Sequence, residues 1–247
     1  MRPLALAWFV AALAAPVSAA EAPLPTPDEV QQRWLRLHEG RHFTATLLRR
    51  EGQGMQRLTL RRDEEEGRER VLLRFEKPHA IAGRSWLLRE QPGDEDELYY
   101  YSTRNRGVPA RRLPSLKARD PLRGTDPSLL GLRAGRWRTV ALSVEAVERN
   151  GTPALLLSER CDDPDAPFEL RRVWLDPETG IAMRLEQERE GQILLVGEVL
   201  DLREIQGVTT PVRVRFERPN REPVVYRFET IDYQRPIRAS YFELPDS

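Results

Sequence analysis

The chain has 247 residues, and its 39 basic (Lys and Arg) and 39 acidic residues cancel in net charge. Without a net field to attract polyanions, nucleic acids are not expected as partners. Hydrophobic residues make up 40% of the chain, enough for a substantial core, and the single cysteine, Cys161, excludes an internal disulfide.

Residues 1–20 have the pattern of a secretory signal peptide. Arg2 supplies a positive charge, an apolar stretch covers residues 4–15, and small residues at 17–20 suit cleavage. The apolar stretch is too short to span a membrane, and no cysteine stands at the cleavage point to carry a lipid anchor. We therefore expect export to the periplasm and a single domain over residues 21–247.

One short amphipathic helix is predicted after a proline-rich leader. Residues 28–37 carry acidic side chains in the first turn and apolar side chains at helical spacing, and Gly40 suits the end of the helix. From His42 onward, alternation with period two predicts strands, and Asn150-Gly151 and Glu190-Gly191 indicate tight turns. The predicted strands are 42–50, 55–62, 69–76, 84–90, 97–103, 137–148, 153–160, 168–175, 181–188, 192–203, 209–217 and 223–234. Strands in such a series predict a large, strongly curved antiparallel sheet.

The segment 111–133 breaks this rhythm, because its leucines are interrupted by Pro114, Pro121, Gly124 and Pro127. A long connection inside a domain is often a lid or a binding loop. The alternative is a surface excursion that packs its leucines onto the core, and the sequence leaves both open.

Residues 38–42, His-Glu-Gly-Arg-His, match the H-E-x-x-H signature of zinc peptidases. That chemistry needs both histidines on one face of a continuous helix, with the glutamate acting on a zinc-bound water. Here Gly40 stands inside the motif and His42 begins a strand pattern, so a helix terminus is the favoured interpretation and a zinc peptidase the weak alternative.

Other motifs carry less chemistry. The acidic run 94–97 is favoured as a charged hairpin tip over a cation site, since alternation would point its side chains to opposite faces. The nucleophile elbow, the P-loop and the dinucleotide fingerprint are missing from the sequence. We expect no catalytic residues, no metal and no cofactor, and therefore a protein that is not an enzyme.

An ordered set of segments resembles the outer-membrane lipoprotein-sorting protein family, the LolA-like periplasmic carriers. The segments are Val71-Leu72-Leu73-Arg74-Phe75-Glu76-Lys77-Pro78, Gly83-Arg84-Ser85-Trp86-Leu87-Leu88, Asp94-Glu95-Asp96-Glu97-Leu98-Tyr99-Tyr100-Tyr101, Arg111-Arg112-Leu113, Gly124-Thr125-Asp126 and Val173-Trp174-Leu175-Asp176-Pro177-Glu178-Thr179-Gly180. The likeness runs from about residue 42 to the C-terminus. Residues 127–130 depart from the aromatic-rich sequence usual in the family, and residues 102–107 replace a proline-containing turn.

The resemblance implies an α+β, mainly β fold: an incomplete β-barrel whose concave face is covered by short helices or a lid loop around a hydrophobic cavity. Aromatic and large aliphatic residues on apolar strand faces are the candidates for binding lipid there. They are Val71, Leu73, Phe75, Trp86, Leu88, Tyr99, Tyr101, Phe216, Tyr226 and Phe228. The candidates on the lid side are Trp34, Leu37, Leu129 and Leu130.

The function implied is a periplasmic carrier for a lipid or for the acyl chains of a lipoprotein, transferred between membranes or to and from an exporter. The expected partners are this cargo and an inner-membrane exporter or outer-membrane acceptor, with the carrier itself a monomer. The alternative on the same fold is a sensor of mislocalised lipoproteins that regulates an envelope-stress response. Such sensors usually carry a second, smaller domain. Because a single domain is expected here, the carrier is favoured over the sensor.

Overall fold

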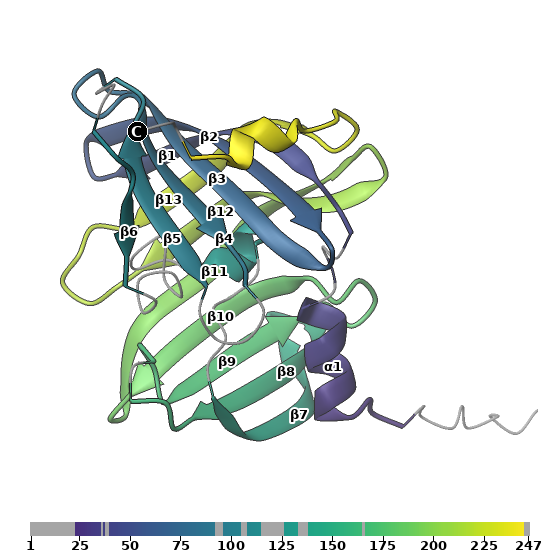
Figure 1. Ribbon diagram of the computed structural model, residues 1–247. Helices are drawn as coiled ribbons and strands as arrows, with labels where there is room; N and C mark the ends of the chain where they lie inside the picture. Colours follow the sequence, from purple (N-terminus) through teal and green to yellow (C-terminus); the bar gives the residue numbers. More distant parts are fainter. Residues whose placement is uncertain are drawn as a thin grey trace, which may run out of the picture.

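In the part of the chain that the structure describes, the alternating residues form thirteen strands of a single antiparallel sheet (Figure 1). The computed structural model describes residues 23–35, 37, 40–91, 96–104, 108–114, 126–132, 138–164 and 166–244, so the predicted signal peptide lies outside the described residues. The strands are β1 (Phe43–Glu51), β2 (Gly54–Glu65), β3 (Arg68–Lys77), β4 (Arg84–Arg89), β5 (Glu97–Ser102), β6 (Arg111–Leu113), β7 (Thr139–Arg149), β8 (Thr152–Cys161), β9 (Leu170–Leu175), β10 (Ala182–Arg189), β11 (Gln192–Ile205), β12 (Val208–Glu217) and β13 (Val224–Asp232).

Strands that follow one another in the chain lie side by side, and the first strand pairs with the last. The order across the sheet is β6-β5-β4-β3-β2-β1-β13-β12-β11-β10-β9-β8-β7, so β6 and β7 are its edges and the sheet is not closed. Several tight hairpins join the strands through two residues that both have positive φ, as at Asn150-Gly151 and Glu190-Gly191. The predicted fold class, a curved antiparallel sheet forming an incomplete β-barrel, is confirmed.

One strand lies where none was expected. Residues 111–113 form β6, which pairs with β5 through Leu98 opposite Leu113, although the prediction placed them in an irregular connection. The proline-rich sequence around them hides a three-residue strand, because such a strand is stabilised by its neighbour rather than by its own pattern. The predicted helix also ends two residues early, since α1 covers Pro27–Leu35.

Short helices cover both faces of the sheet. The helix α1 packs against β7 and β8, and the 3-10 helix η1 (Pro127–Leu130) packs against β10, β11 and β12 on the concave face. The 3-10 helix η2 (Ala239–Phe242) packs against β3 on the convex face, seen at the top of Figure 1. Among the described helices, none is long and apolar enough to cross a membrane.

Candidate functional site

The concave face of the sheet is a continuous apolar surface, and strand register shows how it is built. Leu157 of β8 lies opposite Val173 of β9, which lies opposite Leu185 of β10. Leu185 in turn lies opposite Gly197 of β11, and Gly197 lies opposite Phe216 of β12. Since directly opposite residues share a face, rows of this kind carry apolar side chains across the whole sheet into one main core.

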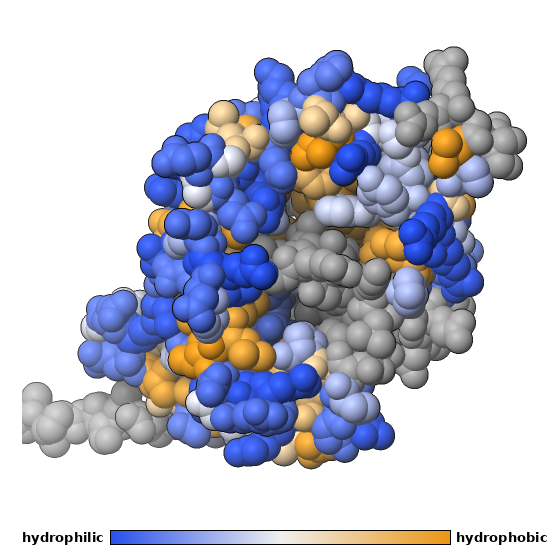
Figure 2. Space-filling model, turned by 90° about the vertical axis from the view of Figure 1, so that its left-hand side faces the viewer, coloured by the Kyte–Doolittle hydropathy of each residue, from blue (hydrophilic) through white to orange (hydrophobic). Residues whose placement is uncertain are grey.

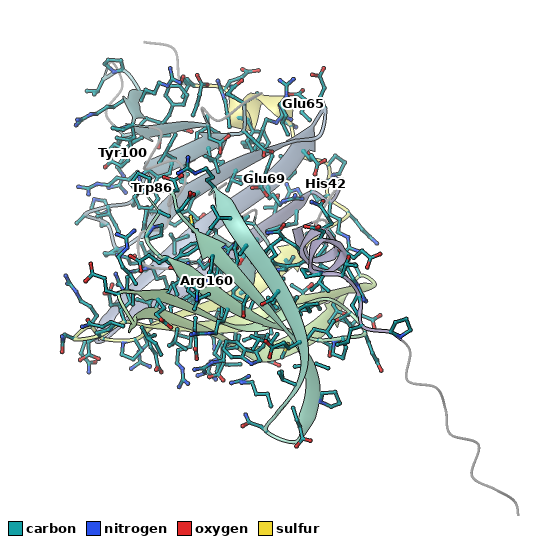
Figure 3. All side chains as sticks on the ribbon, turned by 90° about the horizontal axis from the view of Figure 1, so that it is seen from below. His42, Glu65, Glu69, Trp86, Tyr100 and Arg160 are labelled. Carbon is teal, nitrogen blue, oxygen red and sulfur yellow. The ribbon has the colours of Figure 1, made fainter. Side chains whose placement is uncertain are left out.

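Eight of the ten predicted lipid-binding residues lie on or against this face. Phe75 and Trp86 are in edge-to-face contact with ring centroids 5.1 Å apart, and Trp86 also contacts Tyr100 of β5 at 6.4 Å (Figure 3). Phe216 and Tyr226 make a similar edge contact at 6.0 Å on β12 and β13. The eight predicted residues that belong to the main core or pack against it are Val71, Leu73, Phe75, Trp86, Leu88, Phe216, Tyr226 and Phe228.

The structure places the other two predicted residues, Tyr99 and Tyr101, on the opposite side of the sheet. Tyr99 lies opposite Leu87, which lies opposite Leu72, and this row belongs to a second core on the convex side. Tyr101 is buried in the same cluster with Phe242 of η2. These two tyrosines are therefore separated from the concave face by the sheet itself. The register places their neighbours Leu98 and Tyr100 on the concave side instead.

The lid-side leucines fill the middle of the concave face. Leu129 and Leu130 of η1 are 1% and 3% exposed and belong to the main core. The helix stops at Gly131, whose φ of 73° is readily adopted by glycine. Trp34 of α1 is 4% exposed in the same core, and Leu37 is half-buried beyond the end of α1. Of the predicted lid segment 111–133, residues 115–125 and 133 lie outside the described residues.

A buried ionic network fastens η1 and α1 to the sheet, and sequence reasoning missed it. Asp126 caps η1 by accepting a hydrogen bond from the backbone N of Ser128 at 2.9 Å, and its other oxygen faces the guanidinium of Arg171 at 3.4 Å. Arg171 also donates to Glu159 at 2.8 and 2.5 Å. The Arg171 guanidinium lies 5.0 Å from the centroid of the Trp34 ring. The network therefore joins both covering helices to β8 and β9.

The electrostatics of this network favour the charged form of Arg171. Burial by itself would lower the pKa of Arg171, but the carboxylates of Glu159 and Asp126 raise that pKa above its usual value. Gln187 of β10 donates a further hydrogen bond to Asp126 at 3.0 Å. The only signal of this network in the sequence was the position of Arg171, which by alternation lies on the same strand face as Val173 and Leu175. A charge on such an apolar face needs a partner.

A second buried arginine holds the chain between α1 and β1. Arg62 of β2 is fully buried; its Nε donates to Glu69 at 2.6 Å and its Nη1 donates to the carbonyl of Arg41. Glu64, 3.6 Å from Arg62, accepts a hydrogen bond from the backbone N of Gly40 at 2.9 Å. These contacts fix the point from which α1 extends over the concave face.

An apolar pocket of about 360 Å³ lies where α1 meets β8 and β9. Arg33 crosses from α1 to donate hydrogen bonds to the carbonyls of Pro177 and Glu178 in the turn before β10. The residues that line the pocket are Pro25, Glu29, Val30, Arg33, Leu155, Leu175, Asp176 and Gly180. Val30, Leu155 and Leu175 also belong to the main core, so the pocket borders that core. Figure 2 shows hydrophobic side chains above and below the centre of one side of the molecule.

The histidine motif does not form one helix. The helix α1 ends at Leu35, Gly40 has a φ of 70°, and His42 directly precedes β1. His38 and Glu39, like Asp94 and Glu95 of the acidic run, lie outside the described residues. Within the described ranges, His, Cys, Asp and Glu side chains form no group of three that could hold a metal ion. The thiol of Cys161 is buried, and burial raises its pKa.

Comparison with known structures places this architecture in a fold class. An outer membrane lipoprotein-sorting protein domain from Vibrio parahaemolyticus is 17% identical with a TM-score of 0.71, and the match covers 88% of this chain and 95% of that domain. A LolA superfamily protein from Nitrosomonas europaea is 14% identical with a TM-score of 0.64, covering 89% and 98% of the two chains. A DUF1329 family protein from Desulfovibrio piger is 14% identical with a TM-score of 0.65, covering 89% and 98%.

The open sheet with a covered apolar concave face is thus the LolA-like fold, as the resemblance implied. The search of curated proteins finds no match. Residues 67–245, more than half of the chain, match a family model described as "Uncharacterized protein", and the chain belongs to that family.

Proposed function

We propose that this protein is a periplasmic carrier that holds the hydrocarbon chains of a lipid or lipoprotein against the concave face of its sheet. One observation carries the proposal: the concave face is apolar across the strands, and its covering elements touch it mainly through Trp34, Leu129 and Leu130. The solved structures with this fold include a protein described as an outer membrane lipoprotein-sorting domain, which supports the same role.

The energetics suit a cargo with long apolar chains. Each methylene moved from water to an apolar surface contributes about 0.8 kcal/mol, so binding needs few polar contacts. Leu129 and Leu130 already occupy the middle of the face. Hydrocarbon that displaced η1 would therefore exchange one apolar contact for another, and the pocket beneath α1 offers a place for such chains to enter.

The role we propose is not enzymatic. The buried carboxylates that could serve as an acid or a base are each engaged by an arginine: Glu69 by Arg62, and Asp126 and Glu159 by Arg171. The contacts of these three carboxylates account for a structural role in fastening the covering elements.

The test is lipid analysis of the protein purified from the periplasm, by native mass spectrometry followed by extraction. We expect lipid to co-purify with the wild type and to be lost from Trp86→Asp and Phe228→Asp, because a charge on the concave face is costly beside hydrocarbon. Ile193→Asp, at a side chain 43% exposed in the β10–β11 hairpin, is the matched control and should retain lipid. Circular dichroism checks that each variant is folded.

Two results would count against the carrier. One is a folded Trp86→Asp variant that retains the same lipid as the wild type. The other is a wild-type protein that carries no lipid from the periplasm and does not bind a fluorescent fatty acid in solution.

A further inference from the structure

The convex side of the sheet carries a row of residues across five strands, and four of the five residues are basic. Arg213 of β12 lies directly opposite Arg227 of β13, and Arg227 lies opposite Leu48 of β1. Leu48 lies opposite Arg57 of β2, which lies opposite Lys77 of β3. Like charges directly opposite one another in a sheet are destabilising, so this arrangement calls for an explanation outside the folding of the chain.

Five exposed cations on this side have no ion pair among the residues that the structure describes; together they are called the basic face. They are Arg50, Arg74, Lys77, Arg213 and Arg227. Arg50 and Arg74 make one neutral hydrogen bond each, to the carbonyl of Gly52 and the hydroxyl of Thr103. Arg213 and Arg227 are both exposed and lie directly opposite each other in the sheet.

Most of the acids nearby are already engaged by other arginines, including Asp201, which lies directly opposite Arg213 and 3.1 Å from Arg203. Glu229 lies 3.3 Å and Glu76 lies 3.8 Å from Arg57. Glu217 lies 3.0 Å from Arg215, which also contacts Glu198 at 2.9 Å. Burial and the charges of Arg74 and Arg235 lower the pKa of Arg61, which lies next to the basic face on β2, although the neighbouring Tyr241 and Glu76 act the other way. The local potential is therefore positive although the whole chain is neutral.

Apolar side chains are interleaved with these cations. Arg50 lies opposite Val225 on one side and Met55 on the other. Met55, beside the turn between β1 and β2, is 63% exposed, and Leu48 and Val225 are half-buried. A surface of dispersed cations and exposed apolar groups matches a bilayer interface, where anionic headgroups lie over hydrocarbon.

We propose that the basic face docks on the surface of a membrane that contains anionic phospholipids. The cations contact headgroup phosphates, and Met55 and Leu48 lie at the headgroup boundary. Docking leaves the concave face pointing away from the bilayer plane, because the two faces lie on opposite sides of the sheet. The proposal does not depend on the carrier function, since the residues involved are different.

Sedimentation with vesicles tests this docking. The mature wild-type chain should bind vesicles of phosphatidylglycerol and phosphatidylcholine in equal parts, bind vesicles of phosphatidylcholine alone only weakly, and be released by added salt. Arg213→Gln/Arg227→Gln should lower the partition coefficient roughly 30-fold, because each basic residue near an anionic surface contributes about 1 kcal/mol. Met55→Gln should lower it several-fold by removing an apolar contact.

The matched control removes the same charge elsewhere. Arg111→Gln/Arg160→Gln changes two exposed arginines on β6 and β8 that also have no ion pair among the described residues, and it should leave binding unchanged. Equal losses in both double variants, or no binding to anionic vesicles, overturn the proposal. A wild type that ignores vesicles but binds polyglutamate, with that binding lost in Arg213→Gln/Arg227→Gln, would assign the face to an acidic polypeptide instead.

Discussion

Leu129 lies directly on Gly197: a Cβ atom on Gly197 would stand 2.5 Å from Cδ1 of Leu129 and 3.0 Å from Cε1 of Phe216. The glycine lets η1 approach the backbone of β11 in the middle of the concave face, where any larger residue would hold the helix away. The contact between the lid side and the sheet therefore depends on the absence of one side chain.

Gly197→Ala should lower the free energy of unfolding by about 1 to 3 kcal/mol, because the added methyl group overpacks this contact. Leu129→Ala should lower it by about 2 to 5 kcal/mol through the cavity it leaves. In the double variant the methyl group enters that cavity, so the combined loss should be about 1 kcal/mol or more below the sum. Urea denaturation of the four proteins measures this coupling, and strict additivity would show that η1 does not rest on Gly197.

The ion pair between Asp126 and Arg171 should be costly to break. Asp126→Asn keeps an oxygen that can cap η1 but removes the charge facing Arg171. We expect a loss of about 3 kcal/mol, at the lower end for a buried pair, because Glu159 still faces Arg171. Asp162→Asn is the control, since its ion pair with Arg138 is largely exposed and should contribute much less to stability. Equal effects of the two substitutions on urea denaturation would argue against a fastening role for Asp126.

The strands could be predicted because most of them are half-buried and their side chains alternate. On β1, for example, Phe43, Ala45 and Leu47 are buried while the residues between them are partly exposed. The face that each strand turns inward could not be read in the same way. In the run Tyr99-Tyr100-Tyr101 every residue is aromatic, and only the register with β4 shows that Tyr99 and Tyr101 point to the convex side. The C-terminal Phe242, far away in sequence, makes that side apolar as well.

The candidate site was predicted in part for the same reason. Apolar residues such as Phe75 and Phe216 follow from their strand patterns, but the polar contacts that fasten the covering helices join segments distant in the chain. Asp126 and Arg171 are 45 residues apart, and Arg33 reaches a carbonyl 144 residues away. Single-sequence periodicity carries no information on such pairs, because it reports which residues are buried and not which residues meet.

Glu198 should contribute to stability in a manner that depends on pH. A hydrogen bond from Arg149 at 2.7 Å, with the charges of Arg215 and Arg184, lowers the pKa of this carboxyl below its ordinary value of 4.5. Because the folded-state pKa is the lower one, the stabilisation is fully present above pH 4.5 and is lost as the pH falls through the folded-state pKa. Glu198→Gln should therefore be less stable than the wild type at pH 7, by about 1 kcal/mol.

The difference between wild type and Glu198→Gln should shrink steadily as the solution is acidified below pH 4.5. Thermal unfolding across this range measures it, with Glu204→Gln as a control, since Glu204 is exposed and has no ion pair among the described residues. A difference that is the same at pH 7 and at acid pH would show that charge is not its source.

The thiol of Cys161 should react slowly and report on the opening of its own corner of the molecule. Cys161 is 7% exposed and packs with Ala166 and Phe168 in a separate small core, and burial raises its pKa, so little thiolate is available at neutral pH. Phe168 also lies under the Arg171 guanidinium, at 5.2 Å. Phe168→Ala should therefore accelerate modification by a disulfide reagent many-fold.

The control is Phe242→Ala, which removes a ring of the same size from the convex core; both changes should cost about 3 to 5 kcal/mol. If the reaction proceeds by local opening, only Phe168→Ala accelerates it under native conditions, whereas equal acceleration by both variants would mean that Cys161 is reached only through global unfolding.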